Sequence, residues 1–125
     1  MDITPLVAAD RQIIQSYSTK GFKVSGTAHA GAVAVFTDRT EAWNYQGDVS
    51  GLTETDFAIV TDRADDIDVV LLGTGKAMSM LSPEIRTALK AKGLNVESMD
   101  SGAACRTYNV LMTEGRRVVA LLLPL

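Results

Sequence analysis

The chain is poor in the residues that build disulfides and soft-metal sites. Its 125 residues include one cysteine, Cys105, and one histidine, His29. A single cysteine cannot form an internal disulfide, which suits a protein of a reducing compartment. With so few sulfur and imidazole ligands, a structural zinc site is not expected. We therefore expect no metal and no cofactor.

Positive charge is also scarce. The formal net charge is −3, the sequence pI is near 5.0, and the only adjacent basic pair is Arg116 and Arg117. Binding to phosphate backbones needs a concentrated basic surface. Nucleic acid is therefore not the expected partner.

Targeting and membrane signals are missing as well. The chain has an acidic residue, Asp2, near its start, and it has neither the basic region of a signal peptide nor the Arg-rich character of a transit peptide. The apolar run 118–125 is far shorter than the roughly 20 residues that cross a bilayer. We expect a soluble, cytoplasmic protein with no transmembrane segment.

What is present fits one domain, because 125 residues with 46% hydrophobic content can form one sizeable core. We predict an N-terminal extension over 1–12 and a core over 13–125. In the first half, strands 13–17 and 22–25 flank a hairpin turn at 18–21. A polar connection follows between Gly26 and Gly31, then a strand over 32–36, a loop over 37–52 and a short helix over about 53–62, capped by Thr53 or Thr55.

The second half alternates strands and helices. Apolar runs without polar alternation predict strands over 68–73 and 118–123 that are buried on both faces, adjacent or near the centre of a sheet. Between them we predict a helix from Ser82 to Lys92, a strand over 95–99, and a helix over about 102–114 capped by Asp100 or Ser101. This order predicts an α/β fold, a single three-layer domain with a central mixed, mostly parallel sheet and flanking helices.

The helix over 102–114 has two different faces. Helical spacing places Tyr108 with Ala104, Leu111 and Met112, so its ring is expected in the core with the hydroxyl at the edge. Arg106 and Asn109 fall on the other side with Thr113. That side is either a solvated surface or part of a site.

The sequence GTGK over 73–76 follows a buried strand but does not fit a phosphate-binding P-loop. Val70 and Ala77 stand where that loop needs a glycine and a hydroxyl, so no nucleotide hydrolysis is expected. In a mostly parallel sheet this loop would lie at the carboxyl edge, beside the start of the helix that carries Arg106, where α/β folds place ligands. The loop is either a tight turn or one side of a cleft for an anionic ligand, with Arg106 as a fork for carboxylate or phosphate. The residues of that predicted cleft are Gly73, Thr74, Gly75, Lys76, Asp100, Arg106 and Asn109.

Other candidate groups have a structural and a functional reading. Cys105 is either a small buried hydrophobe, which we favour, or a thiol whose pKa is lowered at a helix start. His29 lacks an identifiable Ser or Cys partner, and no complete catalytic set is apparent. Trp43 and Tyr45, in the predicted loop, are either anchors on a partner surface or aromatics that cap the core.

Three segments together resemble a known family: VSGTAHAGAVAVF over 24–36, LLGTGK over 71–76, and the whole of 81–125. The most specific parts are Gly73 to Gly75, the stretch from Met99 to Asn109, and Glu114 to Arg117. The chain is similar, from about Ile13 to Leu125, to the small domain of unknown function in bacteria and archaea whose mitochondrial member is NADH:ubiquinone oxidoreductase complex assembly factor 3.

The resemblance implies a three-layer α/β fold around a mixed sheet. It also implies a non-catalytic, assembly-factor-like role in building respiratory complex I, with another assembly factor or a respiratory subunit as partner. It supplies no catalytic residues. Because the chain shows no mitochondrial targeting extension, we expect a prokaryotic origin; the oligomeric state is left open.

Overall fold

The computed structural model describes residues 10–125 of the chain. The first sheet has three antiparallel strands in the order β1-β2-β3: β1 (Ile14–Tyr17), β2 (Gly21–Val24) and β3 (Thr27–Ala30). The predicted hairpin is confirmed. The predicted polar connection between Gly26 and Gly31 is wrong, because β3 occupies it and pairs with β2. The residues of β3 are small or polar, and they pair with β2 through backbone hydrogen bonds. They lack the alternation of apolar and polar residues by which a strand is recognised in a sequence.

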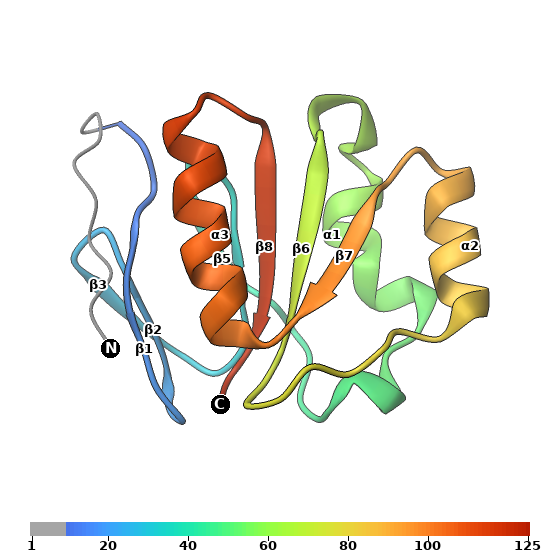
Figure 1. Cartoon of the computed structure of the whole chain (residues 1–125), viewed down its shortest axis with the longest axis horizontal. Helices are drawn as coiled ribbons and strands as arrows, with labels where there is room; N and C mark the ends of the chain where they lie inside the picture. Colours follow the sequence, from blue (N-terminus) through green and yellow to red (C-terminus); the bar gives the residue numbers. More distant parts are fainter. Residues whose placement is uncertain (1–9) are drawn as a thin grey trace.

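The second sheet has five strands in the order β5-β4-β8-β6-β7, with β7 at one edge (Figure 1). Its strands are β4 (Val33–Val35), β5 (Thr40–Ala42), β6 (Val69–Thr74), β7 (Val96–Met99) and β8 (Val118–Leu123). As predicted, β6 and β8 are neighbours in the middle of the sheet, and every residue in both is buried.

The sheet is mixed, but the prediction that it is mostly parallel is wrong. β6 pairs in parallel with β7 and β8, whereas β4 pairs antiparallel with β5 and β8. Parallel strands need long crossovers, and only the segment from β6 to β8 contains helices of that length. The N-terminal strands are joined by short turns, which explain the antiparallel pair of β4 and β5 but not that of β4 and β8. The prediction that helices alone flank the sheet is also wrong. On one face of the sheet, the β1-β2 hairpin packs beside the third α-helix.

The helices follow the sequence signals closely. They are α1 (Ala58–Thr61), α2 (Pro83–Ala91) and α3 (Ser101–Thr113), with short 3₁₀ turns η1 (Val49–Gly51), η2 (Glu54–Phe57) and η3 (Ala64–Asp66). The carboxylate of Asp100 accepts from the Ala103 N–H at 2.9 Å and so caps α3. At the start of η2, Asp56 accepts from the Thr53 N–H at 2.8 Å. No helix within residues 10–125 has the length and apolar character that crossing a membrane requires.

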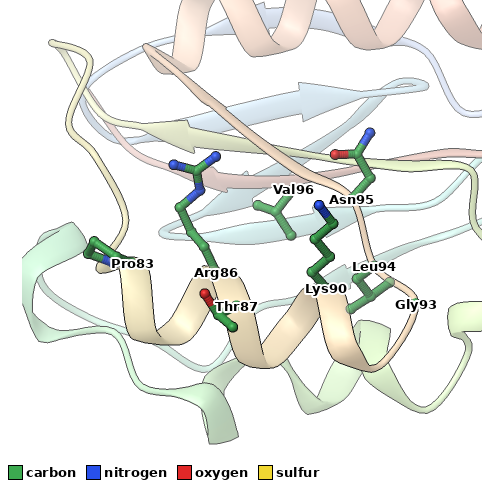
Figure 2. Close-up of a pocket in the computed structure, with 8 residues that line it drawn as sticks. All are labelled: Pro83, Arg86, Thr87, Lys90, Gly93, Leu94, Asn95 and Val96. Carbon is green, nitrogen blue, oxygen red and sulfur yellow. The ribbon is translucent and has the colours of Figure 1, made fainter.

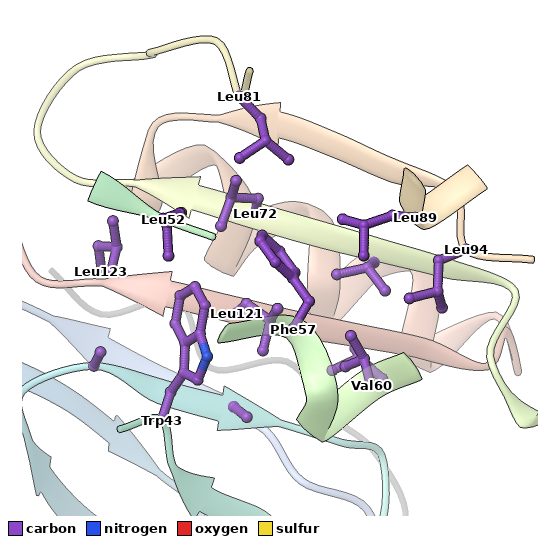
Figure 3. Close-up of a cluster of buried hydrophobic side chains, with 14 of the residues drawn as sticks. Trp43, Leu52, Phe57, Val60, Leu72, Leu81, Leu89, Leu94, Leu121 and Leu123 are labelled. Atoms are coloured by element: carbon purple, nitrogen blue, oxygen red, sulfur yellow. The ribbon is translucent and has the colours of Figure 1, made fainter. Parts of the chain in front are cut away.

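Two apolar clusters lie on opposite faces of the five-stranded sheet. One cluster joins α2, α1, η2 and the segment around Trp43 to Leu72 and Leu121 (Figure 3). The other joins α3 and the β1-β2 hairpin to Leu71 and Leu122. Successive residues of β6 and β8 therefore serve alternate cores, which is why these strands carry no polar positions.

Candidate interaction surface

The loop after β6 and the start of α3 meet at the carboxyl edge of the sheet, as predicted. The Ser101 N–H donates to the Gly75 carbonyl at 2.9 Å, and the Ser101 hydroxyl accepts from the Gly75 N–H at 2.8 Å. The same hydroxyl donates to the Leu123 carbonyl at 2.5 Å. Ser101 is fully buried and thus links the ends of β6 and β8 from the start of α3.

This junction is closely packed. A Cβ at Gly73 would lie 2.9 Å from the Ser101 Oγ and 3.0 Å from the Ser101 Cα, so only glycine allows so close an approach. Gly75 has a φ of +98°, which a side chain would strain. The Thr74 hydroxyl lies 2.7 Å from the Ala77 carbonyl and accepts from the Ser79 N–H at 3.1 Å. Gly73 is therefore explained by the close approach of α3, and Gly75 by the turn.

Arg106 and Asn109 do not join this loop in a shared cleft. Asn109 is buried, its Oδ1 accepts from the Ile14 N–H at 3.0 Å, and its Nδ2 donates to the Ile14 carbonyl at 2.8 Å. Arg106 is exposed, and its guanidinium donates to the Tyr17 hydroxyl at 2.7 Å. Both side chains thus contact β1. Asn109 is therefore neither on a solvated surface nor in the predicted cleft, since the hairpin covers that part of the helix.

Tyr108 and Cys105 are core residues, in line with the readings that we favoured. Tyr108 is fully buried, with its hydroxyl 3.0 Å from the carbonyls of Gln12 and Phe36, to either of which it can donate. Burial raises its pKa. The Cys105 thiol is also fully buried, and desolvation raises its pKa to about 12 despite the nearby Arg106 charge. A thiol in this state is a poor nucleophile.

The predicted partner surface at Trp43 and Tyr45 is corrected in part. Trp43 is buried with 4% exposure, and its indole N–H donates to the Asp56 carbonyl at 2.8 Å, so it is a core residue. Tyr45 is half-buried, its ring centroid lies 5.9 Å from that of Trp43, and its hydroxyl donates to the Asp48 carbonyl. The pair shapes a shallow hollow but offers no free indole to a partner.

The surface of the described residues has four hollows that lie away from the predicted cleft. None of these four is lined by a residue of that cleft. Two of the four adjoin each other along the free side of β7, with volumes of about 540 and 280 Å³, and share Arg86, Asn95 and Val96. We call these two together the α2–β7 groove. Its further lining residues are Met78, Met80, Pro83, Thr87, Lys90, Gly93, Leu94, Glu97 and Ser98.

The cations of the groove come from one side of α2. Figure 2 shows Arg86 and Lys90 extending from the helix in the same direction, with Asn95 facing the same space. Neither basic side chain forms a hydrogen bond or ion pair with any described residue. By contrast, Lys92 pairs with Glu54 at 2.9 Å and Arg117 with Asp68 at 2.9 Å. The groove therefore holds two positive charges without an ion-pair partner, together with one carboxylate, that of Glu97, in a chain of net negative charge.

This arrangement carries a small cost in stability. Arg86 and Lys90 are four residues apart, where like charges destabilise a helix by about 0.2–0.5 kcal/mol. The nearest acid on the helix, Glu84, is two residues from Arg86 and does not face it. A basic pair without an acidic partner at helical spacing was the signal in the sequence that our reasoning missed.

The groove also contains apolar surface. Met78 and Met80 are 52% and 60% exposed, and the only comparably exposed large hydrophobic side chain among the described residues is Val110 on α3. Flexible thioethers adapt to varied surfaces and are common at interfaces.

Comparison with known proteins identifies the family to which the chain belongs. Residues 14–123 match the model of a protein family of unknown function, DUF498/DUF598, and the chain belongs to that family. It is 35% identical over 111 residues to the bovine NADH dehydrogenase (ubiquinone) 1 alpha subcomplex assembly factor 3, covering 89% of this chain and 60% of the bovine protein. It is 31% identical to an uncharacterised protein of Rhodobacter capsulatus, covering 90% of this chain and 84% of that protein.

Solved structures show the same fold. A crystal structure described as an outer membrane protein from Bartonella henselae matches with a TM-score of 0.83 and 33% identity, covering 93% of this chain and 97% of that one. A Bordetella pertussis protein described as a Mth938-like domain, solved by NMR, matches with a TM-score of 0.80 and 29% identity, covering 99% and 92%. The fold is therefore the mixed α/β fold called Mth938-like.

Proposed function

We propose that this protein is a non-catalytic interaction domain that acts as an assembly factor for a respiratory NADH:quinone oxidoreductase. The observation that carries the proposal is the 35% identity to the bovine assembly factor over 89% of this chain. The chain spans 60% of that relative's length, so the match covers part of the bovine protein. Its partners would be another assembly factor or a subunit of the enzyme.

The geometry supports an interaction role over the alternative, an anionic-ligand site or enzyme at the Gly73–Gly75 loop. Such a site needs free donors at the helix start. Here the Ala103 N–H is taken by Asp100 and the Gly75 N–H by Ser101. Arg106 is engaged with Tyr17, and Asn109 with the backbone of β1. These four donors of the predicted cleft thus have partners within the protein, whereas Lys76 is exposed and has no side-chain bond to a described residue.

The test is deletion of the gene in its native host. We expect a lower amount of the assembled oxidoreductase on native gels and a lower rate of membrane NADH oxidation, both restored by the full-length gene. A normal amount of assembled enzyme in the deletion strain would contradict the proposed function. The same strain expressing an Arg106→Ala variant separates the two readings, because loss of a ligand-binding arginine would abolish complementation, whereas we expect this variant to complement.

A further inference from the structure

We propose that the α2–β7 groove docks an extended, acidic segment of a protein partner, which adds to the five-stranded sheet as a strand beside β7. This inference rests on the proposed interaction function and specifies its surface and the chemistry of its partner. Three independent features of the groove carry it: the free edge of β7, the two unpaired cations of α2, and the exposed methionines beside them.

The backbone of β7 is available on its outer side. In a parallel pair, alternate residues direct both backbone groups toward the neighbouring strand. The Asn95 carbonyl accepts from the Val70 N–H at 2.8 Å, so Asn95 faces β6 and the backbone groups of Val96 and Ser98 face outward. Neither residue forms a backbone hydrogen bond with described residues outside the sheet. An added strand would satisfy these groups.

The opposite edge of the sheet is protected. On β5, Glu41 accepts from Arg39 at 2.6 Å and lies 3.4 Å from Arg63, while the Thr40 hydroxyl donates to Gln12 at 2.6 Å. Charged groups on an edge strand oppose pairing with other chains. β7 has one charged residue, Glu97, which lines the groove beside Ser98 and forms no ion pair with a described residue. The two edges therefore differ, and β7 is the one open to pairing on the α2 side.

The cations set the chemistry of the partner. Four residues of α-helix span about 6 Å, and two residues of a strand span about 6.6 Å. Acidic side chains at alternate positions of an added strand point to one face at nearly the spacing of Arg86 and Lys90. The partner segment should therefore carry Asp or Glu two residues apart, with β-branched or aromatic residues between them. Met78 and Met80, which line the same hollow as Arg86, add exposed apolar surface for contact with a bound segment.

The test uses the full-length protein, labelled with ¹⁵N, and an array of synthetic seven-residue peptides. Each peptide has glutamate at its third and fifth positions and varied apolar residues at the second, fourth and sixth. A matched array has lysine in place of glutamate. We expect acidic peptides to bind, to shift the amide signals of Val96 and Ser98, and to slow hydrogen exchange of those two amides. Failure of every acidic peptide to bind, or equal binding by the lysine array, would overturn the proposal.

Variants separate charge from backbone pairing. Arg86→Glu and Lys90→Glu should each weaken binding about tenfold or more, as expected for loss of a charge-assisted contact. Lys23→Glu, an exposed change on the other sheet, should leave binding unchanged. Ser98→Pro removes an outward N–H at a position where an edge strand tolerates proline, and should abolish binding, whereas Ser98→Ala keeps the N–H and should not. If Ser98→Pro does not fold, the exchange rates of the wild-type Val96 and Ser98 amides decide the same point.

Inorganic phosphate is the third probe. If phosphate alone reproduces the peptide shifts and the Val96 and Ser98 amides stay unprotected, the groove is an anion site and strand addition is wrong. The inference and the proposed function can also fail separately. An Arg86→Glu protein that restores the assembled oxidoreductase fully would refute the groove as the docking surface while leaving the assembly role intact.

Discussion

Two regions of this protein contain similar structural elements but differ in whether their polar groups bond to the protein itself. The junction at the start of α3 has a glycine loop after a buried strand and an arginine on the following helix. The α2–β7 groove has an exposed strand edge and an arginine on the preceding helix. At the junction, the polar groups bond to the protein itself. In the groove, Arg86, Lys90 and the outer backbone of β7 have no described partner.

The difference shows why position alone does not identify a site. Parallel strands and helix starts converge at the carboxyl edge, where α/β folds bind ligands. In this chain Ser101 occupies that space, bonding to the ends of both β6 and β8. A polar residue at this edge can thus fill the space of a potential binding site by bonding to the protein itself, instead of binding a ligand.

The largest expected effect separates the buried and exposed sides of α3. Tyr108→Ala should lower the free energy of unfolding by about 3–5 kcal/mol, because it removes a fully buried ring. Val110→Ala, two residues along and 57% exposed, should change it by less than about 0.5 kcal/mol. Urea denaturation of both variants measures this, and equal effects would mean that the faces of α3 are misassigned.

A smaller loss should distinguish the junction from the groove. Ser101→Ala should cost about 1–3 kcal/mol, because the Gly75 N–H and the Leu123 carbonyl lose a buried partner. Ser98→Ala in the groove should stay within about 0.5 kcal/mol. Equal losses of unfolding free energy for Ser101→Ala and Ser98→Ala in the same urea series would contradict this difference between the two regions.

Cys105 gives the junction side of the molecule a pH dependence. A folded pKa raised to about 12, above the ordinary value of 9.0, means that stability is complete below pH 9 and is lost as the pH rises toward 12. Between pH 8 and pH 10 this thiol should remove about 1.4 kcal/mol. Thermal and urea unfolding of wild type and Cys105→Ala over this range should show a shallower decline in the variant. Parallel curves would indicate that the thiol titrates normally in the folded protein.

The smallest expected change in stability is an increase, in contrast to the losses above. Arg86→Glu replaces a like-charge pair with a Glu–Lys pair at favourable helical spacing, so the free energy of unfolding should rise by a few tenths of a kcal/mol. A stabilised variant that no longer binds would indicate that Arg86 is kept for binding and not for the fold. A destabilised variant would mean that the Arg86 side chain stabilises the fold.

Much of the fold was predictable because its signals are local. The strands 69–74 and 118–123, the helix starts at Pro83 and Ser101, and the first hairpin all follow from apolar runs, caps and turns. β3 and the antiparallel pairing of β4 with β8 were not predictable in this way. The first lacks an apolar pattern, and the second joins segments about 85 residues apart, for which local spacing gives no information.

The site was predicted less well than the fold. Sequence reasoning placed the Gly73–Gly75 loop beside the start of α3, because parallel strands share an edge, and the Ser101–Gly75 bonds lie there. It could not foresee that Asn109 clamps the backbone of Ile14, since that depends on where the hairpin packs. The groove was missed because a free strand edge is a property of strand order, which the sequence did not reveal.

Photo-crosslinking in the native host tests the central claim most directly. A photoreactive amino acid is placed at Met80 in the groove or at Val110 on α3, two positions of similar exposure at 60% and 57%. We predict a partner adduct from position 80 that disappears in an Arg86→Glu background, and no adduct from position 110. An adduct from position 110 alone, or one from position 80 that is insensitive to Arg86→Glu, would contradict the account.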